Sequence, residues 1–463
     1  MSDLWELGAL ELGASIRNGT VSSREVVEAH LARIEAVNPA INAVTVTLGD
    51  EARAAADAAD AATARGEVIG PLHGVPFTVK ENIDLAGSPT TQGVTALAGM
   101  VPPLDAPAIA HLRAAGAIPF ARTNLPDIGL RWHTDNELRG PTRNPWDPAR
   151  TPGGSSGGEA AALATGMTPL GVGSDLGGSV RWPSACCGTT AVRPTLGRIP
   201  AATSLEPADA PITMQLMTVH GPMARGALDL RVALEIMSRP SDRDPWYAPV
   251  PVAGRAVPNP IRVATSTQSC DPAVAAGVRR VADALADAGY AVEDATLPAV
   301  TDASEVWLKL VLAEIRTLWP LFETIIGADA RRFLEDALTL SPPLDQAAYA
   351  AAFVARQGIA RTWSQFQSDH PLVLGPVATD LPFLVGTDLD GPEAVDRIRR
   401  SLDLTLLCNC VGLPAVAVPA GIDNRLPIAV QLIGPRYRED VCLTAAWEVE
   451  RALGTLTPID PHP

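Results

Sequence analysis

A lysine and two serines stand in segments that can present a catalytic group. Ser155 lies in Thr151-Pro-Gly-Gly-Ser155-Ser156-Gly-Gly158, and Ser179 lies in Gly173-Ser-Asp-Leu-Gly-Gly-Ser179-Val-Arg181. Lys80 ends the apolar run Val75-Pro-Phe-Thr-Val-Lys80. A serine hydroxyl attacks a carbonyl when a neighbouring base takes its proton. The joint occurrence of these residues predicts a serine hydrolase whose base is a lysine.

A lysine acts as a base only when it is neutral. Its ordinary pKa is about 10.4, so roughly one exposed lysine in two thousand is deprotonated at pH 7. Complete burial lowers the pKa by as much as about 3 to 5 units, because it disfavours the ammonium. We therefore expect the apolar run before Lys80 to bury it, and Ser155 to relay the proton from Ser179 to Lys80.

The glycine-rich segment before Ser179 can stabilise an oxyanion. The backbone N–H groups of Leu176, Gly177, Gly178 and Ser179 itself can converge on the substrate oxygen, because glycine lets a carbonyl approach the backbone closely. Removing one such donor typically costs about 10² to 10³ in rate.

These residues together resemble the amidase signature family, whose members hydrolyse carboxamides with a Ser-cisSer-Lys triad. Lys80, Ser155 and Ser179 match the family's lysine, bridging serine and nucleophile, and the two serines are 24 residues apart, as in the family. Flanking segments also match, among them Gly140-Pro-Thr-Arg-Asn-Pro145 and Gly412-Leu-Pro-Ala-Val-Ala-Val-Pro419. The resemblance covers roughly residues 65–230 and 405–455, and no motif can be placed between about 240 and 400.

The resemblance implies further features of the site. The peptide bond between Gly154 and Ser155 would be cis, and Asp175 and Arg181 would brace the nucleophile loop without touching substrate. Substrate would be lined by the segment after Asn124-Leu-Pro-Asp127, where Ile128 and Trp132 stand, by the loop beyond Arg198, and by the variable middle region of the chain. Met214, which follows that loop, is a further candidate. Trp132 and Met214 would equally serve as core.

The leading interpretation is a stand-alone amidohydrolase that cleaves the C–N bond of small or aryl carboxamides through a Ser179 acyl-enzyme. The same tetrahedral chemistry would extend to esters, anilides and carbamates. One alternative is the glutaminase subunit of a tRNA-dependent amidotransferase, which typically carries Met-Asp-Glu-Phe where this chain has Leu125-Pro-Asp-Ile128. Another is a catalytically dead binding protein of the same fold.

A second serine-hydrolase pattern competes with this interpretation. Gly-x-Ser-x-Gly occurs twice, at 153–157 and 154–158, and would indicate the nucleophile elbow of an α/β-hydrolase. That elbow must follow a strand. The residues before it contain three prolines in nine positions, which is incompatible with a central strand. His462, the histidine such a triad would need, is the second-last residue.

Composition narrows the classes of partner. The 463 residues carry a formal charge of −16, which disfavours nucleic acid and anionic membrane surfaces. A small amide or carbamate is the expected substrate, and a second copy of the chain is the one protein partner considered. No window approaches the 18 or so apolar residues of a spanning helix, so we expect a cytoplasmic enzyme with reduced thiols. The seven histidines show no ligand spacing, and neither a metal nor a cofactor is expected.

Helical and strand patterns alternate along the chain and predict an α/β architecture. The resemblance makes this a large mixed twisted β-sheet covered by α-helices. We expect one amidase domain over 1–463, with N-terminal helices at 1–65, the triad core at 66–235, a variable substrate-side region at 240–400 and the rest of the core at 401–463. The capping box Ser22-x-x-Glu25 predicts a helix that stops near Asn38-Pro39.

Overall fold

Strands from most of the chain meet in one mixed sheet. The structure is a computed structural model that describes residues 3–67, 70–206 and 209–462. Within these residues the sheet has 11 strands in the order β1-β3-β2-β4-β6-β5-β10-β11-β9-β7-β8. The strands are β1 (Val44–Thr47), β2 (Pro76–Lys80), β3 (Ile118–Thr123), β4 (Leu170–Asp175), β5 (Thr190–Arg193), β6 (Val219–Ala224), β7 (Arg262–Thr265), β8 (Ala291–Asp294), β9 (Leu372–Pro376), β10 (Ala415–Asp423) and β11 (Leu426–Ile433).

The parallel strands β3, β2 and β4 determine where the site lies. β2 pairs in parallel with both neighbours, with Thr78 opposite Gly171 and Lys80 opposite Thr123. Every residue of β2 is buried, as expected for a strand that is covered on both faces. Because parallel strands end at the same edge of a sheet, the last residues of β2 and β4 lie side by side there.

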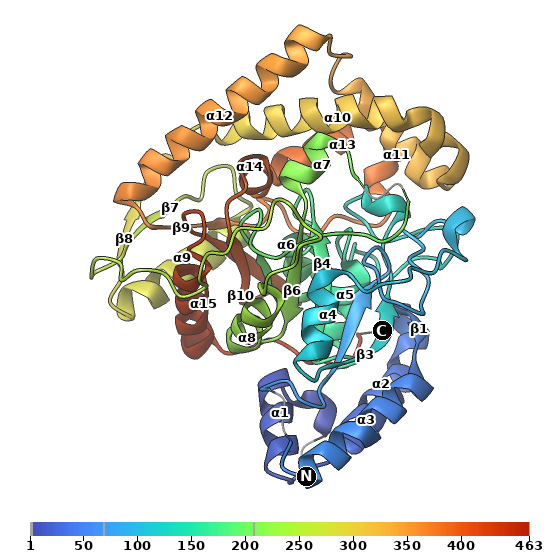
Figure 1. Cartoon of the computed structure of the whole chain (residues 1–463). Helices are drawn as coiled ribbons and strands as arrows, with labels where there is room; N and C mark the ends of the chain where they lie inside the picture. Colours follow the sequence, from blue (N-terminus) through green and yellow to red (C-terminus); the bar gives the residue numbers. More distant parts are fainter. Residues whose placement is uncertain (1–2, 68–69, 207–208, 463) are drawn as a thin grey trace.

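Helices cover both faces of the sheet, and Figure 1 shows α10 and α12 crossing above the strands. The helices are α1 (Ala9–Arg17), α2 (Ser23–Ile41), α3 (Gly49–Ala64), α4 (Pro107–Ala114), α5 (Gly157–Ala164), α6 (Arg181–Cys187), α7 (Ile212–Met217), α8 (Ala227–Met237), α9 (Pro272–Asp287), α10 (Val300–Ile325), α11 (Ala328–Thr339), α12 (Gln346–Asp369), α13 (Pro392–Ser401), α14 (Asp403–Val411) and α15 (Glu439–Leu453). Short 3₁₀ turns are η1 (Leu4–Glu6), η2 (Thr95–Leu97), η3 (Asp127–Gly129) and η4 (Thr387–Leu389).

Two hydrophobic cores lie on the two faces of the sheet. One packs α5, α6 and α10–α14 against it, and the other packs α1, α4, α8, α9 and α15. The mixed sheet covered by helices is thus confirmed. The triad region lies on the face that α5 and α10–α14 cover.

Two glycines let α5 approach the sheet closely. A Cβ on Gly158 would lie 2.4 Å from the backbone nitrogen of Asn124, and a Cβ on Gly171 would overlap the carboxylate of Glu159. The Gly-Gly pair that opens α5 therefore serves packing as well as the serine loop.

The predicted N-terminal helix differs from α2 at one end. The capping box is confirmed: Ser22 accepts a hydrogen bond from the Glu25 N–H, and Glu25 accepts one from the Ser22 N–H. The predicted stop near Asn38-Pro39 is wrong, because α2 continues to Ile41. Asn42, in the left-handed region, ends the helix and donates its N–H to Asn38 O.

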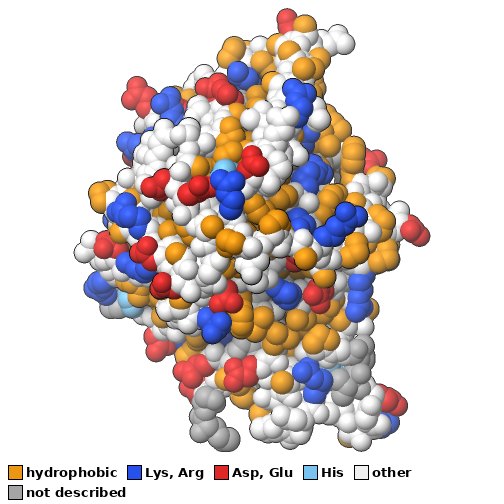
Figure 2. All heavy atoms as spheres, turned by 90° about the vertical axis from the view of Figure 1, so that its left-hand side faces the viewer, with side chains coloured by type: hydrophobic (Ala, Val, Ile, Leu, Met, Phe, Trp, Pro, Cys, Tyr) orange, Lys and Arg blue, Asp and Glu red, His pale blue; other side chains and the backbone are white. Residues whose placement is uncertain are grey.

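The surface shown in Figure 2 carries acidic and basic side chains interspersed with apolar patches. No helix in the described part of the chain is long and apolar enough to cross a membrane. In residues 3–67, 70–206 and 209–462, no group of three or more histidine, cysteine and acidic side chains is arranged to hold a metal ion. All six cysteines are free thiols, and five of them are buried.

Candidate active site

Lys80 ends β2 and points its amine at two serine hydroxyls. Its Nζ lies 2.7 Å from Ser155 Oγ and 3.1 Å from Ser174 Oγ. Ser174 stands next to last in the parallel strand β4, so the shared sheet edge brings the two residues together. Asn82 Nδ2 donates to the same Ser174 oxygen at 2.9 Å.

Ser155 lies in an irregular loop just before α5. The Gly154–Ser155 peptide bond is cis, as the resemblance predicts. No strand precedes this loop between residues 135 and 154, so the α/β-hydrolase elbow is excluded. His462 bonds to Trp146 O at 3.1 Å instead of approaching a serine.

Burial changes the protonation of the lysine. Lys80 is fully buried, as predicted, and burial lowers its pKa to about 7, although the charges of Asp175 and Glu159 act in the opposite direction. A lysine with this pKa is present in both its neutral and its charged form near neutral pH. It is therefore suited to take up and return a proton.

Glu159 is a buried carboxyl beside the lysine that sequence reasoning missed. It accepts hydrogen bonds from Thr78 Oγ1 and, at 2.7 Å, from Thr123 Oγ1. Burial raises its pKa to about 7, although the two threonines and Lys80 lower it. The signal in the sequence was weak, because a glutamate in the first turn of a helix usually faces solvent.

The two serine loops touch each other. The Ser156 N–H donates to Ser179 O at 3.1 Å, which fixes the Ser179 loop against the Ser155 loop. Within the described part of the chain the Ser179 hydroxyl makes no hydrogen bond. Catalytic hydrogen bonds are often long in free enzymes and tighten when substrate binds. The contact between Ser155 and Lys80 is thus formed, and that between Ser179 and Ser155 is not.

Backbone N–H groups around Ser179 differ in their availability. The Gly178 N–H donates to Asp175 Oδ1 at 2.9 Å, so this predicted oxyanion donor is already engaged. The N–H groups of Leu176, Gly177 and Ser179 have no acceptor among the described residues. These three are the donors available to an oxyanion.

Asp175 and Arg181 are joined in a fully buried ion pair under this loop. Arg181 Nε lies 3.1 Å from Asp175 Oδ2, and Asn409 donates to Asp175 Oδ1 at 2.7 Å. Burial alone would raise the pKa of Asp175, but Arg181 and Arg193 hold it well below its ordinary value. A charged Asp175 can therefore accept the Gly178 and Val180 N–H bonds that shape the loop.

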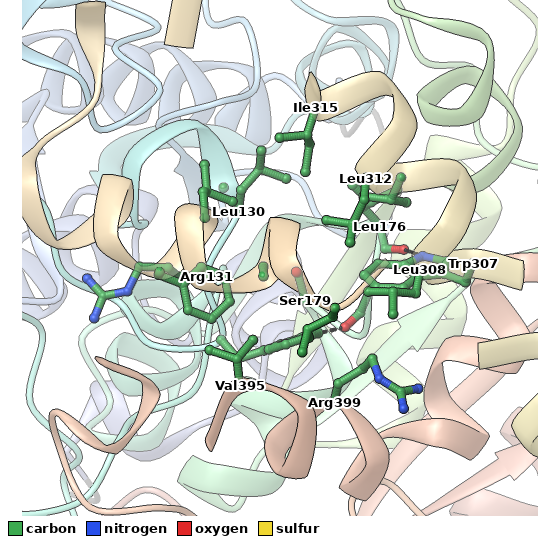
Figure 3. A pocket seen from close by; sticks show the side chains of 18 residues that line it. Leu130, Arg131, Leu176, Ser179, Trp307, Leu308, Leu312, Ile315, Val395 and Arg399 are labelled. Carbon is green, nitrogen blue, oxygen red and sulfur yellow. Dashed lines mark hydrogen bonds between the residues drawn. The ribbon is translucent and has the colours of Figure 1, made fainter. Parts of the chain in front are cut away.

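An apolar pocket opens beside Ser179 (Figure 3). Its cavity volume is about 60 Å³. The residues that line it with Ser179 come from the η3 segment, the nucleophile loop, α10, α11 and α13: Gly129, Leu130, Arg131, Trp132, Leu176, Gly177, Trp307, Leu308, Val311, Leu312, Ile315, Phe333, Leu334, Ala337, Leu340, Val395 and Arg399.

The two arginines of this lining form ion pairs with aspartates that are not part of the lining. Arg131 Nε donates to Asp388 Oδ2 at 2.9 Å, and Arg399 Nε donates to Asp396 Oδ1 at 2.9 Å. Figure 3 shows both guanidinium groups turned away from the space around Ser179. The pocket therefore presents hydrocarbon and aromatic surface to a substrate.

The predicted lining residues fall in different places. Trp132 lines the pocket, whereas Ile128 and Met214 are outside its lining and only partly buried. The resemblance implied that the variable middle region lines the pocket but gave no residue of α10, where Trp307, Val311 and Ile315 follow one another at four-residue spacing. This helical periodicity was the available signal, but it does not tell a pocket wall from an ordinary core.

Comparison with known proteins agrees with this geometry. Residues 25–443 match the protein family described as Amidase. The chain belongs to the amidase signature family. It is 40% identical over 459 residues to an indoleacetamide hydrolase of Bradyrhizobium diazoefficiens, covering 98% of this chain and 88% of that protein. It is 33% identical to one subunit of the glutamyl-tRNA(Gln) amidotransferase of Anaeromyxobacter sp. strain K, covering 100% of this chain and 99% of that protein.

Solved structures of amidase signature enzymes superpose on nearly the whole chain. A bacterial aryl acylamidase matches with a TM-score of 0.84 and 25% identity, covering 97% of this chain and 96% of that one. A 6-aminohexanoate cyclic dimer hydrolase with bound substrate matches with a TM-score of 0.82 and 28% identity, covering 97% and 98%. The chain is thus an amidase signature hydrolase, from a family that acts on amides.

Proposed function

We propose that this amidase hydrolyses primary amides of small carboxylic acids that carry an aryl group, releasing the acid and ammonia. The observation that carries the proposal is the position of Ser179 in the wall of an apolar pocket whose charged side chains are paired elsewhere. The acyl group would lie in this pocket with its carbonyl carbon at Ser179 Oγ. An arylacetamide such as indoleacetamide, the substrate in the name of the relative that is 40% identical, is the first candidate.

The reaction begins with attack of Ser179 Oγ on the amide carbonyl. The Ser179 proton passes to Ser155 Oγ as the Ser155 proton passes to neutral Lys80, 2.7 Å away. The negative charge that develops on the carbonyl oxygen is placed among the N–H groups of Leu176, Gly177 and Ser179. Donors fixed in advance stabilise this charge without reorganisation.

The tetrahedral intermediate collapses when the C–N bond breaks. The proton held by Lys80 returns through Ser155 to the leaving nitrogen, and ammonia departs. A water molecule then attacks the Ser179 ester, gives its proton to the same relay and releases the carboxylic acid and the Ser179 hydroxyl. Esters, anilides and carbamates of similar shape would follow the same steps.

The glutaminase alternative has less support from the pocket. Glutamine carries an ammonium and a carboxylate that need charged partners when they are buried. The two charged residues in the lining, Arg131 and Arg399, are held by Asp388 and by Asp396 and Asp403. The apolar lining therefore favours the stand-alone hydrolase, despite 33% identity to part of an amidotransferase.

The test is a substrate panel for the purified wild type and the Ser179→Ala variant. The panel contains indoleacetamide, phenylacetamide, acetamide, glutamine, an aryl ester and an aryl carbamate, and ammonia or product acid is measured. We expect the aryl amides to give the highest kcat/KM, with no turnover by Ser179→Ala. Preference for glutamine, or equal turnover by the Ser179→Ala variant, would contradict the proposal.

A further inference from the structure

Two tryptophans of the pocket wall also hold the nucleophile loop. Trp307 Nε1 donates to Leu176 O at 3.0 Å, and Trp132 Nε1 donates to Gly177 O at 3.0 Å. Figure 3 labels Trp307 and Leu176 in the pocket wall near Ser179. Each indole thus contributes its ring to the apolar pocket and its N–H to a backbone carbonyl next to the nucleophile.

The carbonyls they hold belong to peptide groups that are intrinsically free to turn. Gly177 and Gly178 lack a Cβ, so the peptide groups on either side of Gly177 rotate at little steric cost. Residues with side chains could not replace Gly177 and Gly178 to restrict these peptide groups. A Cβ on Gly177 would lie 2.8 Å from Trp307 Cζ2, and Gly178 has a φ of +93°, which disfavours any residue with a Cβ. Hydrogen bonds from outside the loop must therefore set its orientation.

The N–H and C=O of a trans peptide point in opposite directions. When Trp307 holds Leu176 O, the Gly177 N–H of the same peptide group must point away from the indole nitrogen. That N–H has no acceptor among the described residues. The next peptide group is held at both ends, by Trp132 on Gly177 O and by Asp175 on the Gly178 N–H.

The indole of Trp182 supports Trp132. Trp182 Nε1 donates to Trp132 O at 3.0 Å, and its ring stacks on Phe383 with centroids 6.2 Å apart. The rings of Trp132 and Trp307 lie 6.3 Å apart. The backbone and side chain of Trp132 are both held, so its hydrogen bond to Gly177 O has a fixed direction.

We infer that Trp307 and Trp132 are positioning residues for the oxyanion hole, and that they link acyl-group recognition to catalysis. This inference rests on the proposed function, because it takes Ser179 as the nucleophile and the free N–H groups as the oxyanion donors. An aryl acyl group packed against the two rings restricts their motion and, through their N–H groups, that of the loop. Aryl recognition should then appear in kcat and not in KM alone.

The decisive experiment removes the indole N–H and keeps a flat apolar ring. Trp307→Phe and Trp132→Phe are compared with wild type and with Trp363→Phe. Trp363 is a matched control, because it is fully buried, lies outside the pocket lining and donates to Pro298 O at 2.7 Å. Thermal melting is recorded for all proteins, and Trp307→benzothienylalanine, which keeps the bicyclic shape without the N–H, is the second variant if Trp307→Phe does not fold.

Two rates are measured for each protein. One is the rate at which a fluorophosphonate labels Ser179, which needs the oxyanion hole but no knowledge of the natural substrate. The other is kcat and KM for phenylacetamide and acetamide. We expect the labelling rate and kcat to fall about tenfold or more in Trp307→Phe and Trp132→Phe. This loss is smaller than the roughly 10²- to 10³-fold fall in rate when an oxyanion donor is removed altogether. KM should change less than about threefold. The kcat advantage of phenylacetamide over acetamide should shrink.

The outcomes separate this inference from the proposed function. Wild-type labelling and kcat in Trp307→Phe and Trp132→Phe would overturn the inference and leave the proposed function intact. An equal loss in Trp363→Phe, or a loss confined to KM, would also overturn it, because packing alone would then explain the effect. A wild type that neither labels nor hydrolyses any amide would refute the proposed function itself.

Discussion

The two sides of Ser179 are built in different ways. On one side, Lys80, Ser155 and Ser174 are polar groups at strand ends and in loops, joined by hydrogen bonds over short distances. On the other side, α10, α11 and α13 supply aliphatic and aromatic surface. The polar side holds a lysine partly neutral at the expense of folding stability, whereas the apolar side gains stability from burial. Away from Trp307 and Trp132, whose indoles join the two sides, changes on one side should leave the other unaltered.

The largest expected effect is on the polar side. Ser179→Ala removes the proposed nucleophile and should lower kcat by roughly 10⁴-fold or more, because the members of a catalytic triad act as a unit. Ser155→Ala should lower kcat nearly as far while KM for phenylacetamide stays within about threefold. Steady-state ammonia release checks both. A Ser155→Ala variant with near wild-type kcat would mean that Lys80 takes the Ser179 proton without a relay.

Lys80 should control the pH dependence. The proposed mechanism takes neutral Lys80 as the base, so kcat/KM should rise with pH and level off above about 7, where the pKa of Lys80 lies. Below that pH, the rate should fall about tenfold per pH unit. Lys80→Ala should lower kcat/KM by roughly 10²- to 10⁴-fold, and its pH profile should lack the inflection near pH 7. An inflection that persists in Lys80→Ala would assign the titration to another group.

The same lysine should make stability depend on pH in a defined window. Between pH 7 and 10.5 the unfolded chain holds a proton on Lys80 that the folded chain has released, so the contribution of Lys80 to wild-type stability rises with pH through this window. Lys80→Met lacks the titrating amine, so neither its folded nor its unfolded chain binds this proton. Its free energy of unfolding relative to wild type should therefore decrease by about 3 kcal/mol between pH 7 and pH 10, measured by urea denaturation.

The matched control for this measurement lies on the apolar side. Leu312→Ala removes pocket surface without a titrating group and should lower stability by about 2 to 5 kcal/mol at both pH values. A pH-independent difference between Lys80→Met and wild type would show that the folded-state pKa of Lys80 is not depressed.

The smallest expected effect is a change of substrate preference from the apolar side. Val311→Phe narrows the pocket and should lower kcat/KM for phenylacetamide by roughly 10- to 100-fold, while acetamide changes less than about threefold. Leu321→Phe is the control, because Leu321 lies on the same helix, is 54% exposed and is outside the pocket lining. Equal losses for both amides would mean that the acyl group does not lie along α10.

Much of the polar side could be predicted from residues close together in the sequence. The apolar run before Lys80 predicted its burial, and the glycine-rich segments predicted the two serine loops. The engagement of Gly178 by Asp175 and the buried Glu159 could not be predicted in this way, because they depend on how the loop folds back and on α5 lying against β2 and β3. The continuation of α2 past Pro39 likewise depends on the Asn42 cap and its contacts with residues 139 and 141.

The apolar side was the part that sequence alone left open. Trp307 lies 128 positions after Ser179 in a region without a matching motif, and its periodicity is that of any amphipathic helix. The sequence by itself determined the family and supplied the triad candidates, because the segments around Lys80, Ser155 and Ser179 each carry a local pattern of residue types. Only the tertiary structure decided the pocket, the free N–H donors and the indole contacts, because packing between distant helices depends on the whole fold and leaves no local pattern.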